Sequence, residues 1–318
     1  WQTFRSASFF CMGNSVIIYP MKTGMKIALL LGFILLSGCA RQTTLTQVHP
    51  ATTQEPAVTV EPTVTPTSLP MALKVNGEGI LLSEYESELS RLQAALTELG
   101  QEMTLEEQKE RVLGNFTDEL LLAQAAGKSG FTVTDEEVQA RIDRLATDMG
   151  GVEKLAEWQS TNGYTDETFR VALKRAIAVA WQRDTIVNNV PETAEQIHAR
   201  QLFFKNEANA IAALAQLKKG IDFSTLARQQ DDVLGGDLGW FPRGVLTQAE
   251  VEEVVFTMQP GETSEIIASN LGYHIVNVIE REPEHPLSTE ARLILQEKAL
   301  ATWIENARAA STIEILVP

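Results

Sequence analysis

The stretch that decides the fold is Gly235-Gly236-Asp237-Leu238-Gly239-Trp240-Phe241, followed along the chain by Gly272-Tyr273-His274-Ile275. The crowded glycines of the first stretch indicate tight backbone turns, because glycine adopts left-handed conformations without a steric penalty. The second stretch belongs to a predicted pair of strands that runs through Val276. We interpret Trp240 and Phe241 as core residues, since aromatic side chains bury large apolar surfaces.

Working outward, the pattern predicts a compact domain over residues 195–281. A strand over 197–204 precedes a helix over 206–219, and a short helix over 248–256 leads to the turn Pro260-Gly261-Glu262. This order predicts a β-α-β-α-β2 arrangement, in which helices cover a small antiparallel sheet.

The run GGDLGWF, PGE-x-S and GYHI resembles the parvulin, or rotamase, domain of peptidyl-prolyl isomerases. The resemblance implies catalysis of rotation about X–Pro bonds, which must overcome an amide barrier of about 18–20 kcal/mol. Uncatalysed rotation is slow enough to limit folding. No bond is broken, so we expect neither a cofactor nor a metal. A catalyst need only bind the twisted amide better than either planar isomer.

The resemblance also implies a set of site residues: two sheet histidines, a Cys or Asp, a hydroxyl and an apolar proline pocket. His274 matches the second histidine and Ser269 the hydroxyl, while Gln201 stands at the position of the first histidine. The acidic position falls to Asp231 or Asp232, and the pocket to Leu246, Val251 and Leu271. Since Gln201 cannot titrate and Val251 replaces a pocket Phe, we expect weak isomerase activity.

The residues themselves leave other interpretations open. His274 is equally consistent with a core histidine that fixes the sheet. Ser269 is compatible with a loop hydroxyl bonded to backbone, and Asp231 and Asp232 with a solvated loop. Alternation along the strand predicts that His198 faces the other side of the sheet from Gln201.

Residues 72–190 predict a helical region that opens with a strand, turn and strand over 73–80. Capping boxes, in which a Ser or Thr and a Glu three residues later bond each other's backbone, predict three helix starts; these are Ser83/Glu86, Thr104/Glu107 and Thr134/Glu137. Further helices are expected over 152–160 and 166–189. The order of these features resembles the N-terminal regions of the SurA and PrsA foldase-chaperone families.

The segment 288–318 predicts a helix over 289–310 and a strand over 312–317. The helix carries an apolar stripe, wide enough to require burial, made of Leu293, Leu300, Ile304 and Ala307 with Trp303 beside them. The family resemblance implies that this segment returns to complete the N-terminal region. Packing on the isomerase domain and dimerisation are the alternatives. The expected fold class is therefore α+β, a helical chaperone region plus a parvulin-like domain.

The first 71 residues predict a targeting segment and a tether rather than a folded domain. Residues 1–20 look like translated upstream sequence, and 21–39 have the positive start and short apolar run of a signal peptide. The run ends in Leu36-Ser37-Gly38-Cys39, which resembles the lipobox of bacterial lipoproteins, with Cys39 as the lipidated residue. Residues 40–71 are rich in Thr and Pro and predict an extended tether.

Composition narrows the function classes. The formal net charge of −16 argues against nucleic acid as a partner, because phosphate binding needs clustered Lys and Arg. Together, the parvulin, SurA/PrsA and lipobox resemblances imply a foldase that is lipid-anchored on the extracytoplasmic side of the cell membrane and acts on unfolded or partly folded exported proteins containing X–Pro bonds. The alternative is a holdase or peptide-binding module with a degenerate parvulin domain. The sequence leaves the oligomeric state open.

Overall fold

The computed structural model describes residues 69–317, so the predicted signal peptide, Cys39 and residues 40–68 of the tether lie outside the described part. Met71, assigned to the tether by the sequence, is instead the first residue of a strand. Within residues 69–317, no helix is both long enough and apolar enough to cross a membrane.

The helical region begins with two short strands and continues through five helices. These are β1 (Met71–Val75), β2 (Glu78–Leu81), α1 (Leu82–Leu99), α2 (Leu105–Lys128), α3 (Asp135–Met149), α4 (Val152–Thr161) and α5 (Asp166–Asn188). The capping boxes at Thr104 and Thr134 are confirmed. The one predicted at Ser83 is wrong, because β2 runs directly into α1 and Leu81 occupies the N-cap without a side-chain bond.

The C-terminal segment completes this helical region. It consists of α9 (Thr289–Ala309) and β7 (Ile313–Ile315). Strand β7 pairs antiparallel with β1, with Leu73 opposite Ile315, and makes a three-stranded sheet in the order β2-β1-β7. Trp303 and Ala307 of α9 pack against a core that contains Leu73 and Phe116. The segment thus returns to the N-terminal region, as the resemblance implied.

The predicted burial of the apolar stripe on the last helix is wrong for one residue. Leu293 is 60% exposed, whereas Leu300, Ile304 and Ala307 are partly buried. The helix buries Ala291 at its start, and its C-terminal half packs on the core built around β1 and α2. A second apolar cluster joins α3, α4 and α5 through Ile142, Leu155 and Phe169.

A second sheet forms the domain in the middle of the chain. Its elements are β3 (Thr193–Phe204), α6 (Glu207–Lys218), α7 (Phe223–Gln230), β4 (Asp237–Pro242), α8 (Ala249–Val255), β5 (Ile267–Ser269) and β6 (Gly272–Pro286). The strand order is β4-β3-β6-β5, with every neighbouring pair antiparallel. Strands β3 and β6 pair from Phe204–Tyr273 to Thr193–Pro286, so the sheet extends beyond the predicted range 195–281 at both ends.

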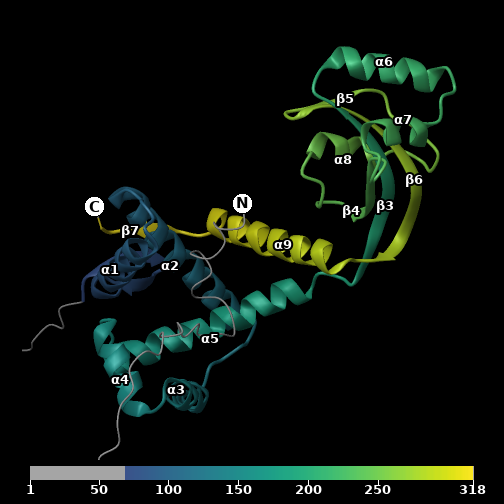
Figure 1. Ribbon diagram of the computed structural model, residues 1–318. Coiled ribbons are helices and arrows are strands. Elements are labelled where there is room, and N and C mark those ends of the chain that lie inside the picture. The colour runs from purple at the N-terminus through teal and green to yellow at the C-terminus, as the bar shows by residue number, and fades with distance from the viewer. Residues whose placement is uncertain (1–68, 318) are drawn as a thin grey trace, which may run out of the picture. The chain divides into compact units, whose positions relative to one another are not determined.

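Helices cover both faces of this sheet (Figure 1). On one face, Val251 and Val255 of α8 pack with Phe241, Phe256 and buried strand residues. On the other face, α6 and α7 cover Leu202 and Ile275. The core interpretation holds for Phe241, which is 3% exposed. It is wrong for Trp240, which is partly exposed and stacks on His285 with ring centroids 4.1 Å apart.

Candidate functional site

Three of the predicted site residues meet on the face of the sheet that α8 covers. Strand β3 carries Gln201, β5 ends at Ser269, and β6 carries His274. The register places His274 opposite Phe203 on one side and Ile267 on the other. His274 Nε2 lies 2.8 Å from Ser269 Oγ, and His274 Nδ1 lies 3.0 Å from Gln201 Oε1. The three side chains therefore form one hydrogen-bonded chain across three strands.

The partners of His274 fix its tautomer. With Gln201 Oε1 as an acceptor, Nδ1 carries the proton, and Nε2 accepts a hydrogen bond from the Ser269 hydroxyl. The same hydroxyl oxygen accepts the backbone N–H of Leu271 at 3.2 Å. His274 is 2% exposed. Burial lowers its pKa, and the opposing effect of the Glu250 carboxylate is smaller. The imidazole is therefore neutral at neutral pH.

An aromatic side chain that the sequence reasoning missed completes the surroundings of His274. The ring of Phe203 lies 5.0 Å from the imidazole, and the Lys205 ammonium lies 5.0 Å from the same phenyl ring. Strand alternation could have found Phe203, because residues two apart on a strand share a face and Gln201 was already assigned to this one.

The predicted pocket residues differ in what they offer to a ligand. Val251 is 2% exposed inside the cluster beneath α8, and Leu246 is partly buried against the same cluster. Leu271 is 50% exposed on the turn between β5 and β6. In this arrangement Val251 presents almost no surface to a ligand.

The acidic candidates do not join the chain of hydrogen bonds. Asp231 Oδ1 accepts the backbone N–H groups of Val233 and Leu234, which together lower the pKa of that carboxyl. Asp232 is exposed on the same loop. Within residues 69–317, the hydrogen bonds of the His274 ring go to Gln201 and Ser269, and neither aspartate is among them.

This loop is nevertheless fixed directly to the site. The Gln201 N–H donates to the Gly236 carbonyl at 2.9 Å. Gly236 has a φ of +68°, and a Cβ there would lie 2.1 Å from the Gln201 carbonyl oxygen. Only glycine fits this approach, so the GGDLG stretch holds the backbone of Gln201 in place.

The opposite face of the sheet carries a separate polar pair. His198 Nε2 lies 2.9 Å from Asp237 Oδ1, which also accepts the Gly239 N–H at 2.8 Å. Asp237 thus stabilises the glycine turn, and His198 is not part of the site. Within the described part of the chain, no group of three His, Cys, Asp or Glu residues is placed to hold a metal.

Chemically, this arrangement offers oriented hydrogen bonds from side chains that are uncharged at neutral pH. The chain presents a hydroxyl held by a neutral imidazole, which is itself held by an amide. The protons of Ser269 and of the His274 ring are used within this chain, so the groups left to direct hydrogen bonds at a twisted amide are the Ser269 oxygen and the Gln201 amide.

Comparison with known proteins identifies both regions. The profile of the PPIC-type PPIASE domain matches residues 189–292, and that of the SurA-like N-terminal domain matches residues 57–169. The foldase protein PrsA of Geobacillus kaustophilus is 32% identical over 185 residues, or 55% of this chain and 65% of that protein. The chaperone SurA of Thiobacillus denitrificans is 32% identical over 141 residues, or 38% of this chain and 32% of that protein.

Among solved structures, the crystal structure of PrsA from Bacillus cereus matches with 19% sequence identity and a TM-score of 0.43. The match covers 76% of this chain and 88% of that one. The resemblance stated from the sequence motifs is confirmed by the two family profiles.

Proposed function

Since the chain carries a parvulin-type peptidyl-prolyl isomerase domain and a SurA-like N-terminal domain, we propose that it is a foldase of exported proteins. In this proposal the sheet domain accelerates rotation about X–Pro bonds in unfolded or partly folded clients. The helical region holds the same clients and limits their aggregation. The names of two relatives, foldase protein PrsA and chaperone SurA, support a role in protein folding.

The observation that supports the isomerase role best is the chain Gln201–His274–Ser269. Its central imidazole is buried and neutral, so it orients the Ser269 hydroxyl without taking up a proton at neutral pH. Rotation about an amide breaks no bond and needs no proton carrier. A site of oriented neutral dipoles is sufficient, provided that it fits the twisted amide better than the planar one.

A direct test combines two assays on the same purified protein. A refolding reaction limited by proline isomerisation reports the isomerase, and light scattering of a denatured client reports the holding activity. The proposal expects acceleration in the first assay and suppression of scattering in the second. Suppression without acceleration would support the alternative function instead.

That alternative is a holdase whose parvulin domain binds peptide but isomerises weakly. Two observations favour it: the non-titrating Gln201 at the position of the first histidine, and the burial of Val251 at the position of a pocket phenylalanine. Both reduce the binding energy available to the twisted amide. We therefore expect the acceleration to be small.

The proposal also includes an anchor. The motif Leu36-Ser37-Gly38-Cys39 after a short apolar run supports lipidation of Cys39. Residues 40–70 would then tether the protein to the extracytoplasmic side of the cell membrane. At about 3.1 Å per residue, an extended chain of about 30 residues reaches roughly 90 Å.

A further inference from the structure

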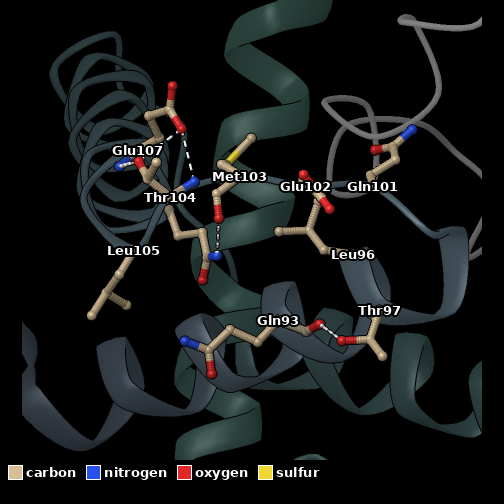
Figure 2. Close-up of a pocket in the computed structure, with 10 residues that line it drawn as sticks. Gln93, Leu96, Thr97, Gln101, Glu102, Met103, Thr104, Leu105 and Glu107 are labelled. Carbon is tan, nitrogen blue, oxygen red and sulfur yellow. Dashed lines mark hydrogen bonds between the residues drawn. The ribbon is translucent and has the colours of Figure 1, made fainter.

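A hollow of about 640 Å³ lies in the helical region at the turn between α1 and α2 (Figure 2). Its lining is mixed. Leu96, Met103 and Leu105 supply apolar surface, Gln93 and Gln101 supply amide groups, and Glu102 and Glu107 supply carboxylates. The amide of Gln108 is already engaged, because it donates to the Met103 carbonyl at 2.7 Å.

A second hollow of about 430 Å³ adjoins the first, because Met103 and Glu107 line both. It follows α2 to Gly114 and is bounded by Arg308 from α9. Arg308 is held in place, since its guanidinium donates to Asp118 Oδ1 at 2.6 Å and to the Gly114 carbonyl at 3.1 Å. We refer to these two neighbouring hollows together as the α1–α2 groove.

The lining of the α1–α2 groove suits a polypeptide segment. Leu96 is 5% exposed at its floor, whereas Leu105 is 54% exposed and available for contact. Glutamine side chains both donate and accept hydrogen bonds, as the backbone of an extended peptide does. An apolar surface interspersed with amides therefore matches alternating side chains and peptide groups.

The charged residues around the groove indicate which kind of polypeptide segment it would bind. Glu102 lines the first hollow and Glu110 the second, and both are exposed. Two cations line the second hollow as well: Arg308 is paired with Asp118, and Arg111 also has a partner within the protein. Exposed carboxylates on an apolar groove attract segments that carry lysine or arginine, and the net charge of −16 acts in the same direction.

We propose that the α1–α2 groove docks an extended segment of a non-native protein in which apolar side chains are flanked by lysine or arginine. This inference rests on the holding activity proposed above and assigns it a place. Residues 40–68 of this chain are a poorer occupant, because they contain one cation, Arg41, against Glu55 and Glu61.

The test uses the full chain and a fluorescein-labelled unstructured peptide of leucine, arginine, glycine and serine, with fluorescence anisotropy as the readout. A second peptide replaces each arginine by glutamate. We expect the arginine peptide to bind more tightly, with an affinity that falls as salt rises.

Matched variants separate the groove from the rest of the surface. Leu105→Ser should weaken binding about fivefold or more, as loss of an interface anchor does. Val152→Ser should not, although Val152 is also an exposed apolar residue that begins a helix. The double change Glu102→Gln and Glu110→Gln should remove most of the preference for arginine. Glu136→Gln with Glu153→Gln, on α3 and α4, makes the same change in net charge elsewhere.

The outcomes distinguish failure of the groove proposal from failure of the proposed holding activity. If the wild-type protein binds peptide and suppresses aggregation while Leu105→Ser matches wild type in both, the groove is not the docking site and the proposed function stands. If the wild-type protein neither binds nor suppresses aggregation, the holding activity itself fails. If deletion of residues 40–68 tightens peptide binding as strongly as Leu105→Ser weakens it, the chain's own segment is the occupant and the inference is overturned.

Discussion

The imidazole of His274 is bonded through Nδ1 to Oε1 of Gln201 at 3.0 Å, across strands β6 and β3. A residue that cannot titrate thus sets the tautomer of the buried histidine. Because Nδ1 keeps its proton, Nε2 is left to accept from Ser269. The side chains of the site are therefore uncharged at neutral pH. The dependence of folding stability on pH follows from this.

The first prediction concerns stability against pH. Burial lowers the pKa of His274 in the folded state below the unfolded value of about 6.5. The unfolded chain therefore binds a proton at a higher pH than the native protein does. Stability from this group is fully present above about pH 6.5 and falls as the pH drops toward the folded pKa. Urea unfolding of the wild-type protein should show this loss, and His274→Gln should show less of it. Equal slopes in the two proteins would mean that other groups cause the loss.

A second prediction corrects what the family pattern alone suggests for Val251. By the family pattern, phenylalanine at this position rebuilds the proline pocket. Because Val251 is 2% exposed and packs with Phe241 and Phe256, a larger side chain should overpack the core and cost about 1–3 kcal/mol. Thermal unfolding of Val251→Phe checks this, with Val171→Phe at a 57% exposed position of α5 as the control. An unchanged melting temperature together with higher isomerase activity would show that the pocket is open after all.

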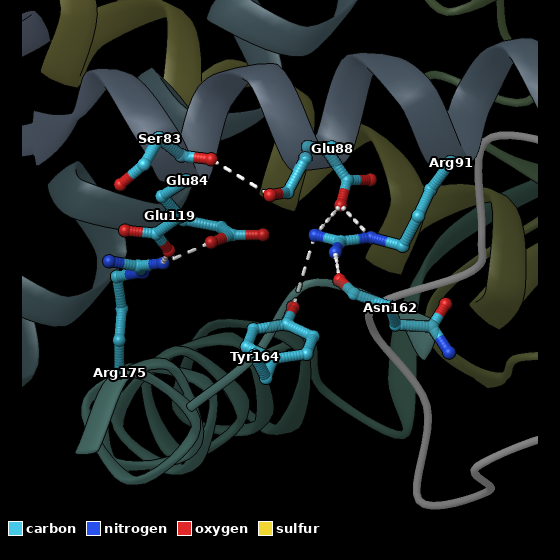
Figure 3. Close-up of polar contacts among 9 residues, drawn as sticks. Ser83, Glu84, Glu88, Arg91, Glu119, Asn162, Tyr164 and Arg175 are labelled. Carbon is cyan, nitrogen blue, oxygen red and sulfur yellow. Dashed lines mark hydrogen bonds and ion pairs between the residues drawn. The ribbon is translucent and has the colours of Figure 1, made fainter. Parts of the chain in front are cut away.

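A third prediction concerns the ion pairs inside the helical region. Figure 3 shows Arg175 of α5 reaching toward Glu84 of α1 and Glu119 of α2, and it pairs with both. Arg175 Nε lies 3.2 Å from Glu119 Oε2. The side chains of Arg175, Glu84 and Glu119 are 11%, 16% and 20% exposed. Removing the cation leaves two largely buried carboxylates uncompensated, so Arg175→Met should cost up to about 3–5 kcal/mol at neutral pH.

The same variant should respond to pH in a defined direction. Burial raises the pKa of Glu119, and Arg175 opposes that shift in the wild-type protein. Without Arg175, the folded pKa rises further above the unfolded value of about 4.3. The variant should then recover part of its stability as pH falls from neutral through that raised pKa. Arg170→Met, at an exposed pair with Asp166 on the same helix, should cost less than about 1 kcal/mol. Equal losses in the two variants would contradict the account.

These ion pairs illustrate what the sequence could not provide. Arg175, Glu84 and Glu119 lie far apart along the chain, and each is compatible with a solvated helix face. Only the packing of α1, α2 and α5 turns them into a buried network. The helix starts at Thr104 and Thr134 were predictable, because a capping box is local chemistry within four residues. The same pattern failed at Ser83, where the preceding strand determines the start of the helix.

The functional site likewise combines features that the sequence predicts with features that arise only from the folded arrangement. The positions of His274 and Ser269 followed from the motifs, and alternation correctly separated His198 from Gln201. The hydrogen bonds that join Gln201, His274 and Ser269 depend on strand register, which pairs residues about 70 positions apart. The roles of Asp231 and Trp240 depend on a short loop and on the long pairing of β3 with β6. Neither could be deduced from local patterns.

The fourth prediction concerns the anchor. A lipid precursor fed to cells that make the protein should label it, and Cys39→Ala should abolish the label and leave the chain unprocessed. Cys11, the other cysteine, serves as the control, since Cys11→Ala should change neither. Label that persists in Cys39→Ala would contradict lipidation at this residue.

The central claim is that the chain Gln201–His274–Ser269 stabilises the twisted amide, and a prolyl-peptide isomerisation assay tests it most directly. We predict a measurable acceleration by the wild-type protein and a loss of roughly tenfold in His274→Ala. Gln201→Leu should lose less, and His198→Ala on the opposite face should lose nothing. Suppression of client aggregation should be unchanged in all three variants. A wild-type protein without any acceleration, or a His274→Ala variant as active as the wild type, would contradict the account.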